Sequence, residues 1–166
     1  MFPIKLKLTE QAIAIRKEQG IDFTPVRGSE LAGGYDIKNC SPEPIEIPLG
    51  QTVQLHTGIH LDIGEVDDDY IDSTEWGLTA LIVPRSGLGS KGFYLRNTIG
   101  VVDADYQGEI LLRASNRNET PITILPGERI AQLLFVPCGV MEFIEVEEFE
   151  EVTERGVSGF GASGRL

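Results

Sequence analysis

The segment from Val83 to Gly92, VPRSGLGSKG, places cationic, hydroxyl and glycine residues close together. Backbone amides in a glycine-rich turn form an anion-binding concavity, and a guanidinium adds bidentate contacts. Arg85, Ser86 and the amide of Gly87 are therefore candidate ligands for an anion. An ordinary polar turn explains the same composition, and the GxxxxGK[ST] spacing of a P-loop is missing.

A second candidate is the turn at residues 103–106, DADY, between an apolar run and the next β-rich run. We expect a hairpin here, with Asp103 at its tip. A carboxylate held in that position can act as a general base, and the ring of Tyr106 beside it can act as a packing wall. Asp103 and Asp105 could equally serve only to shape the turn, as aspartate often does.

Two further segments carry polar or aromatic groups of interest. Gln132 begins an apolar strand, and a buried amide there needs partners, either protein groups or a ligand phosphate. Residues 155–164, RGVSGFGASG, combine Arg155 and Phe160 with four glycines. Such a segment can be a lid that closes over a ligand or simply a mobile tail.

The elements that must position these groups are mostly short strands. The chain of 166 residues suggests one domain, and 19 glycines and nine prolines separate its β-rich runs. This spacing predicts an all-β sandwich or barrel. One short peripheral helix is expected over residues 9–19, capped by Thr9 and ended by Gly20. The expected strands are 52–57, 59–63, 78–83, 109–115, 121–125, 132–136 and 140–149.

Charge and composition exclude several classes of function. The chain has 14 basic and 26 acidic residues, a formal charge of −12, which disfavours a nucleic-acid polymer as ligand. No apolar run is long enough for a membrane, and the start lacks the apolar core of a signal peptide. The two cysteines, Cys40 and Cys138, fit no metal or redox spacing. We expect reduced thiols and a cytoplasmic location, in the host cytoplasm if the protein is viral.

Together with residues 32–37, AGGYDI, five segments of the chain resemble the five motifs of the trimeric dUTPase family. Those motifs read roughly AGYDL, PRSG, GxxDxDYxG, GERIAQ and RGxGGFGSTG, and the resemblance extends from about residue 30 to 165. It implies a jelly-roll-like β-barrel assembled as a homotrimer with sites at subunit interfaces. Residues 1–154 would form the barrel, and residues 155–166 an exchanged arm that closes over a neighbouring subunit's site.

The resemblance also implies an activity, the hydrolysis of dUTP to dUMP and pyrophosphate, which lowers dUTP and supplies dUMP for dTTP synthesis. Asp103 would orient and deprotonate a water that attacks the α-phosphorus, and Tyr106 would pack against the deoxyribose. Mg²⁺ would be held by the triphosphate and waters without direct protein ligands, with Asp36 and Gln132 as candidate contacts to those waters. The implied substrate-binding residues are Arg85, Ser86, Gly87, Asn97, Gly100, Val102, Tyr106, Gln132, Arg155, Phe160, Gly161 and Ser163.

Some positions depart from the family pattern: Gly33 stands for Ala, Ile37 for Leu, Ser158 for Gly and Ala162 for Ser. The Ser158 change could slow closure of the arm, and residues 64–77 look longer than the family needs. Two alternatives remain. One is a dCTP deaminase-like enzyme of the same fold, although no matching Glu-bearing motif is seen. The other is a nucleotide-binding regulator without catalysis, which could dispense with Asp103.

Overall fold

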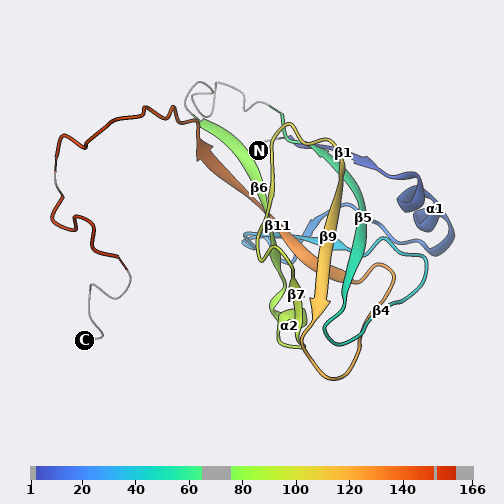
Figure 1. Ribbon diagram of the computed structural model, residues 1–166. Helices are drawn as coiled ribbons and strands as arrows, with labels where there is room; N and C mark the ends of the chain where they lie inside the picture. The colour runs from blue at the N-terminus through green and yellow to red at the C-terminus, as the bar shows by residue number, and fades with distance from the viewer. Residues whose placement is uncertain (1–2, 65–75, 152, 160–166) are drawn as a thin grey trace.

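The computed structural model describes residues 3–64, 76–151 and 153–159, and this part of the chain is mostly β-structure with two helices (Figure 1). The helices are α1 (Glu10–Gln19) and α2 (Ser86–Gly89). The strands are β1 (Lys5–Leu8), β2 (Val26–Arg27), β3 (Tyr35–Lys38), β4 (Ile45–Ile47), β5 (Thr52–Asp62), β6 (Trp76–Pro84), β7 (Phe93–Leu95), β8 (Gly100–Val102), β9 (Glu109–Asn116), β10 (Ile122–Ile124) and β11 (Arg129–Gly139).

The strands form three sheets. One has the order β1-β5-β9-β7, a second has the order β2-β3-β11-β6-β8, and β10 pairs with β4. The mostly β fold class is confirmed. The sheets do not close into a barrel, because the described edge strands of one large sheet do not pair with those of the other.

A single apolar core lies between the two large sheets. On β9, Ile110, Leu112 and Ala114 are buried while Leu111 and Arg113 are exposed, the period of two expected when one sheet face is covered. Strands from the other sheet contribute buried side chains such as Ile37, Ile82 and Leu133. This burial is the main force that holds the two sheets together.

Helix α1 forms where the sequence predicts it. The Thr9 side chain accepts a hydrogen bond from the Ala12 amide at 3.1 Å, and Gly20 ends the helix with a φ of 71°. Within the helix, Ala12 and Ile15 are the buried residues, so only a narrow face packs on β5. The helix is accordingly short and peripheral, as expected.

Three expectations about elements are wrong. Residues 52–57 and 59–63 were expected as two strands, but Thr52–Asp62 is one strand with an irregular register at Gly58. The segment at 86–89, expected as a loop, is the helical turn α2. Residues 140–149 form no strand: after β11 ends at Gly139 they leave the body of the molecule as an extended segment (Figure 1) and so reach no strand of the described chain to pair with.

The acidic run that includes residues 67–69 lies outside the described residues. Among the residues that the structure describes, no helix is both long and apolar enough to cross a membrane.

Candidate active site

The carboxylate of Asp36 lies at the centre of a cationic cluster. Asp36 is on β3, where it pairs with Gln132 of β11, which in turn pairs with Val83 of β6. Its side chain is 4 % exposed, with Arg85 Nε 2.8 Å from one carboxylate oxygen and Arg129 Nη1 3.1 Å from the other. The sheet register therefore brings together residues from three segments of the chain that are far apart in sequence.

The two arginines differ in how they hold this carboxylate. Arg129 Nη1 donates a hydrogen bond to Oδ2. Arg85 Nε is close to Oδ1 but not aligned for a hydrogen bond, so charge attraction is the main interaction there. Arg85 Nη1 also donates to the backbone oxygen of Arg129 at 3.3 Å. A buried carboxylate needs such compensation, and in return it fixes two guanidinium groups whose outer atoms remain accessible.

Gln132 lies beside this cluster and is partly buried. A Cβ atom placed on Gly34 would lie 3.3 Å from Gln132 Cβ and 3.4 Å from its Nε2. Because Gly34 has no side chain, the Gln132 amide has room to lie against the backbone of residues 32–37.

Helix α2 begins directly after Arg85, which occupies its N-cap position. The first amides of a helical turn have no acceptor within the turn. Ser86 and Gly87 supply two of these amides, and the Ser86 hydroxyl adds a third polar group next to the Arg85 guanidinium. A short helical turn thus replaces the expected glycine loop at this position without changing which groups are presented.

The turn that carries Asp103 connects two different sheets. β8 pairs with β6, whereas β9 pairs with β5 and β7, so the expected hairpin is wrong. Asp103 is exposed, and its backbone oxygen accepts a hydrogen bond from the Tyr106 amide at 3.1 Å. Val102 before it is buried, and its oxygen accepts from Thr79 Oγ1 at 2.8 Å. The turn is therefore anchored at its start while the carboxylate faces solvent.

The ring of Tyr106 is 45 % exposed and is held by its own turn. Its hydroxyl donates to the backbone oxygen of Glu109 at 3.0 Å. A Cβ atom on Gly108 would lie only 2.4 Å from that hydroxyl, so only glycine leaves room for the ring in this position.

Asn97 lies at the opposite end of β8. The residue after it, Thr98, has a φ of 58°, which is uncommon for a side chain branched at Cβ. A Cβ on Gly100 would lie 3.2 Å from Asn97 Nδ2, so the glycine lets this amide fold back over the strand.

Within one chain, Asp103 and Arg85 are far apart. Val102 pairs with Ala80 and Gly100 pairs with Ile82, so Asp103 follows β8 toward the beginning of β6, while Arg85 follows its end. Ala80 and Arg85 are separated by roughly 17 Å of extended strand. The fold brings together Asp36, Arg85, Ser86, Gly87 and Gln132, and separately Asp103 and Tyr106.

Arg155 belongs to the C-terminal segment, which extends away from the sheets (Figure 1). Its Nε donates to the Ser158 backbone oxygen at 3.1 Å, so the described contact is local. Phe160, Gly161 and Ser163 lie outside the described residues.

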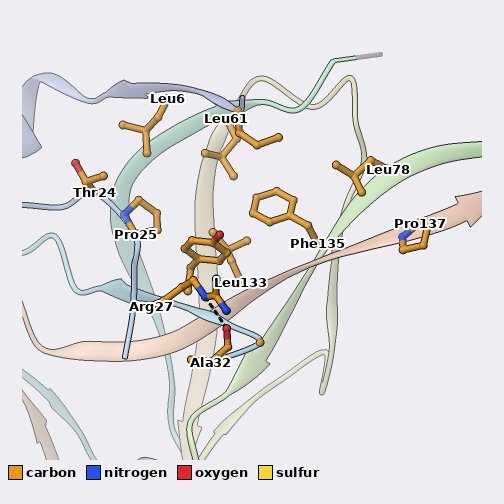
Figure 2. Close-up of a pocket in the computed structure, with 13 residues that line it drawn as sticks. Leu6, Thr24, Pro25, Arg27, Ala32, Leu61, Leu78, Leu133, Phe135 and Pro137 are labelled. Atoms are coloured by element: carbon orange, nitrogen blue, oxygen red, sulfur yellow. Dashed lines mark hydrogen bonds between the residues drawn. The ribbon is translucent and has the colours of Figure 1, made fainter. Parts of the chain in front are cut away.

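A cavity of about 730 Å³ opens elsewhere, between β1 and the sheet that contains β3, β6 and β11 (Figure 2). Its walls are largely apolar and include Leu6, Leu61 and Phe135. Arg27 lies at its rim, where its Nε donates to the Ala32 backbone oxygen at 2.6 Å. None of the residues proposed to contact a nucleotide lines this cavity.

Two contributors to these clusters were missed from sequence. Arg129 forms an ion pair with the Asp36 carboxylate, and the backbone oxygen of Glu109 accepts a hydrogen bond from the Tyr106 hydroxyl. Arg129 stands in the GERIAQ segment, but only the pairing of β11 with β3 places it opposite a carboxylate. For Glu109, nothing in the pattern indicated that its backbone would hold the ring.

Comparison with known proteins identifies the family of this chain. A family profile described as dUTPase matches residues 23–164. The deoxyuridine 5'-triphosphate nucleotidohydrolase of Serratia proteamaculans is 43 % identical over 148 residues, covering 88 % of this chain and 90 % of the relative. The dUTPase of Staphylococcus bacteriophage 80alpha, solved with dUpNHpp, superposes with a TM-score of 0.74 at 25 % identity, covering 99 % of each chain.

A third similar structure is a mutant dUTPase from phage phi11 of S. aureus, described with a structural Mg(II) ion. It has a TM-score of 0.69 at 22 % identity and covers 90 % of this chain and 99 % of its own, so it supports the fold alone. The family profile and the curated relative together cover most of the sequence, including all five motif segments. This chain belongs to the dUTPase family.

Proposed function

We propose that this protein hydrolyses dUTP to dUMP and pyrophosphate, and so lowers dUTP and supplies dUMP for dTTP synthesis. The observation that carries the proposal is the Asp36 cluster, in which one buried carboxylate fixes Arg85 and Arg129, and Arg85 directly precedes the first amides of α2. This arrangement is suited to a polyphosphate, because preorganised cations and amides cost little reorganisation when the anion binds. A family relative named for dUTP hydrolysis supports the choice of substrate.

In this proposal, Arg85, Ser86, Gly87 and Gln132 bind the triphosphate. Asp103 accepts a proton from the water that attacks the α-phosphorus, a contribution worth ~10²–10⁴-fold. Its exposure on a turn anchored by Val102 leaves the carboxylate free to face a bound nucleotide. The remaining acceleration comes from positioning and from the cationic groups around the phosphates.

The base and sugar are assigned to the other group of residues. Tyr106 packs against the deoxyribose and leaves no room for a 2′-hydroxyl, and Asn97 reads the uracil edge together with the backbone at Gly100 and Val102. Arg155 and Ser163, with the amide of Gly161, would grip the terminal phosphate, and Phe160 would stack over uracil.

We propose that Mg²⁺ reaches this site as an ion carried by the substrate. Among the described residues, no group of three histidine, cysteine, aspartate or glutamate side chains could hold a metal ion. Both oxygens of Asp36 already face guanidinium groups. Mg²⁺ commonly binds phosphates and waters, and when bound it neutralises charge on the leaving group. Asp36 and Gln132 remain the groups we propose for contact with its waters.

We further propose that the active unit is a homotrimer with sites at subunit interfaces. Asp103 and Arg85 are too far apart in one chain to act on the same phosphate, since about 17 Å of strand separates their positions along β6. A site that uses both therefore requires Asp103 from a second copy. In this view residues 1–154 form the β-domain, and residues 155–166 form an arm that closes over a neighbouring subunit's site.

The segment that leads to this arm has features of an interface. Phe143 is 96 % exposed and Phe149 is 88 % exposed, values that large apolar side chains rarely keep without a partner. Beside the apolar cavity, the free edge of β1 exposes Lys5 and Lys7, which complement the acidic residues of the segment. A copy of residues 140–149 from another subunit could bury its apolar side chains there.

One assay tests the activity directly. Pyrophosphate release is measured with dUTP, UTP, dTTP and dCTP, with and without Mg²⁺, together with ammonia release from dCTP. The proposal expects pyrophosphate from dUTP far above the others, and only in the presence of the metal. Ammonia from dCTP would indicate the deaminase instead, and tight dUTP binding without turnover would indicate a regulator.

A mixing experiment tests the shared site. Asp103→Asn and Arg85→Ala are prepared separately, each with very low activity, and then mixed under conditions that exchange subunits. If the site spans two chains, mixed trimers contain some sites with both native residues, and activity returns. A mixture that stays as inactive as its components would contradict the shared site.

The two free cysteines fit a cytoplasmic location for this enzyme, which we also propose.

A further inference from the structure

Glu109, the first residue of β9, holds the Tyr106 turn from two sides. Its backbone oxygen accepts the Tyr106 hydroxyl at 3.0 Å. Its side chain accepts a hydrogen bond from the Gly58 amide at 2.9 Å through Oε1, while Oε2 lies 3.0 Å from His56 Nδ1. One residue therefore joins the exposed tyrosine to the neighbouring strand β5.

The part of β5 that receives Glu109 is itself fixed. Gly58 has a φ of 73°, and a Cβ atom there would lie 2.6 Å from Cys40 Sγ and 2.7 Å from Ala12 Cβ. Its backbone oxygen accepts from the Thr9 amide at 2.9 Å, at the start of α1. Burial raises the pKa of the Cys40 thiol to about 11, so this neighbour packs as an uncharged group. The Gly58 amide thus lies at a tightly packed point of β5 where the register shifts. Such irregularities are often found next to functional sites.

A second contact between β5 and the Tyr106 turn involves His60. His60 Nδ1 lies 2.9 Å from the backbone oxygen of Gln107, in the turn between Tyr106 and Glu109. The ring of Tyr106 is half exposed, so packing alone holds it weakly. Its position therefore depends on the hydrogen bond to the Glu109 backbone oxygen and on the His60 contact that fixes the turn.

We propose that Glu109 is a positioning residue for substrate selectivity: by linking Tyr106 to the Gly58 irregularity, it holds the ring where a 2′-hydroxyl would collide with it. This inference rests on the proposed function, in which Tyr106 contacts the deoxyribose. The Glu109 carboxylate side chain is only 19 % exposed, and its loss leaves the Gly58 amide without its acceptor. The start of β9 can then shift, and the ring moves with it.

The test compares kcat/KM for dUTP and UTP in three variants of the trimer. Glu109→Ala removes both side-chain contacts, and we expect the dUTP-to-UTP ratio to fall roughly tenfold, equivalent to ~1.4 kcal/mol of selectivity. Glu109→Gln keeps a carbonyl oxygen for the Gly58 amide and should restore most of the ratio. Glu46→Gln removes one exposed charge on β4 and should leave the ratio unchanged. An unchanged ratio in Glu109→Ala, with stability lowered, would assign Glu109 a merely structural role and overturn the proposal.

A second variant keeps the inference testable if Glu109→Ala does not fold. Gly108→Ala leaves Glu109 intact but adds a methyl group 2.4 Å from the Tyr106 hydroxyl, so it displaces the ring directly. We expect a similar fall in the ratio, and a wild-type ratio in this variant would overturn the proposal.

The outcomes also separate this inference from the proposed function. If the wild-type protein does not hydrolyse dUTP, the proposed function fails. If the wild type is active and Tyr106→Ala lowers the ratio while Glu109→Ala does not, only the role of Glu109 fails.

Discussion

Arg85 Nε lies 2.8 Å from Asp36 Oδ1, although Asp36 is on β3 and Arg85 follows the end of β6, two strands that do not pair with each other. β11 runs between them and contributes Arg129 to the same carboxylate. The pair explains why a carboxylate stands among groups that we propose bind phosphates: both oxygens of Asp36 face guanidinium groups, so Asp36 holds the cations in place and is not a free anion.

Replacing Asp36 by Asn should weaken both stability and substrate binding. The variant keeps the shape of the side chain but leaves two guanidinium groups without their counter-charge. We expect the free energy of unfolding to fall by about 2 kcal/mol, since both arginines are partly exposed and regain water. Urea unfolding and the KM for dUTP measure the two effects. As a control, Asp62→Asn breaks the exposed pair with Lys5 and should cost less than about 1 kcal/mol.

Asp103→Asn should leave the fold and the assembly intact while hydrolysis falls by ~10²–10⁴-fold, because the amide cannot accept the proton from water. Binding of dUpNHpp, measured by calorimetry, should stay within a few-fold of the wild type. Asp105→Asn, in the same turn, is the matched control and should retain most activity. Near-normal turnover in Asp103→Asn would refute its assignment as the base.

Tyr106→Ala should raise activity on UTP relative to dUTP, because removal of the ring opens space beside the sugar. The measured quantity is the ratio of kcat/KM values for the two nucleotides. An unaltered ratio would remove the steric explanation for selectivity, whatever happens to the absolute rates.

Deletion of residues 155–166 should abolish turnover without unfolding the β-domain, since this segment makes no strand pairs in its described part. Circular dichroism and thermal unfolding report on the fold, and pyrophosphate release reports on activity. Deletion of residues 165–166 alone leaves the glycine-rich motif intact and should preserve activity. If the longer deletion remains fully active, the segment is not a lid.

Gly58→Ala and Gly20→Ala form a matched pair. Both glycines have a left-handed conformation, with φ of 73° and 71°, but Gly20 has open space around it while Gly58 meets Cys40 and Ala12. Gly20→Ala should cost about 1 kcal/mol of stability from backbone strain alone. Gly58→Ala should cost about 3 kcal/mol, because overpacking adds to the same strain. If chemical denaturation shows that both variants lose the same free energy of unfolding, the residues around Gly58 move aside for the added methyl group at little cost.

Local chemistry made part of this structure predictable. Thr9 and Gly20 delimit α1 because a cap side chain and a left-handed glycine act within one turn of the helix. The β-rich run at 109–115 predicted the strand that is observed as β9. The five motif segments, in order, also indicated the family.

Two of the expectations that failed depended on long-range pairing. The turn at Asp103 looks like a hairpin in the sequence, but its flanking strands pair in different sheets. Residues 140–149 have the pattern of a strand and still form none, because they run away from the sheets after β11 ends at Gly139 and pair with no described strand of this chain.

The sequence by itself determined the ends of α1 and the approximate positions of β5, β6, β9, β10 and β11, since these follow from side-chain chemistry and short-range geometry. Its resemblance to a family supplied the residues that we propose bind and hydrolyse a nucleotide. Only the tertiary structure decided that Arg85 and Arg129 share the buried Asp36, that Glu109 ties Tyr106 to Gly58, and that Asp103 stands far from Arg85. Those relationships are set by the register and order of strands, which depend on burying the facing sides of the two sheets and so on the whole chain rather than on any one segment.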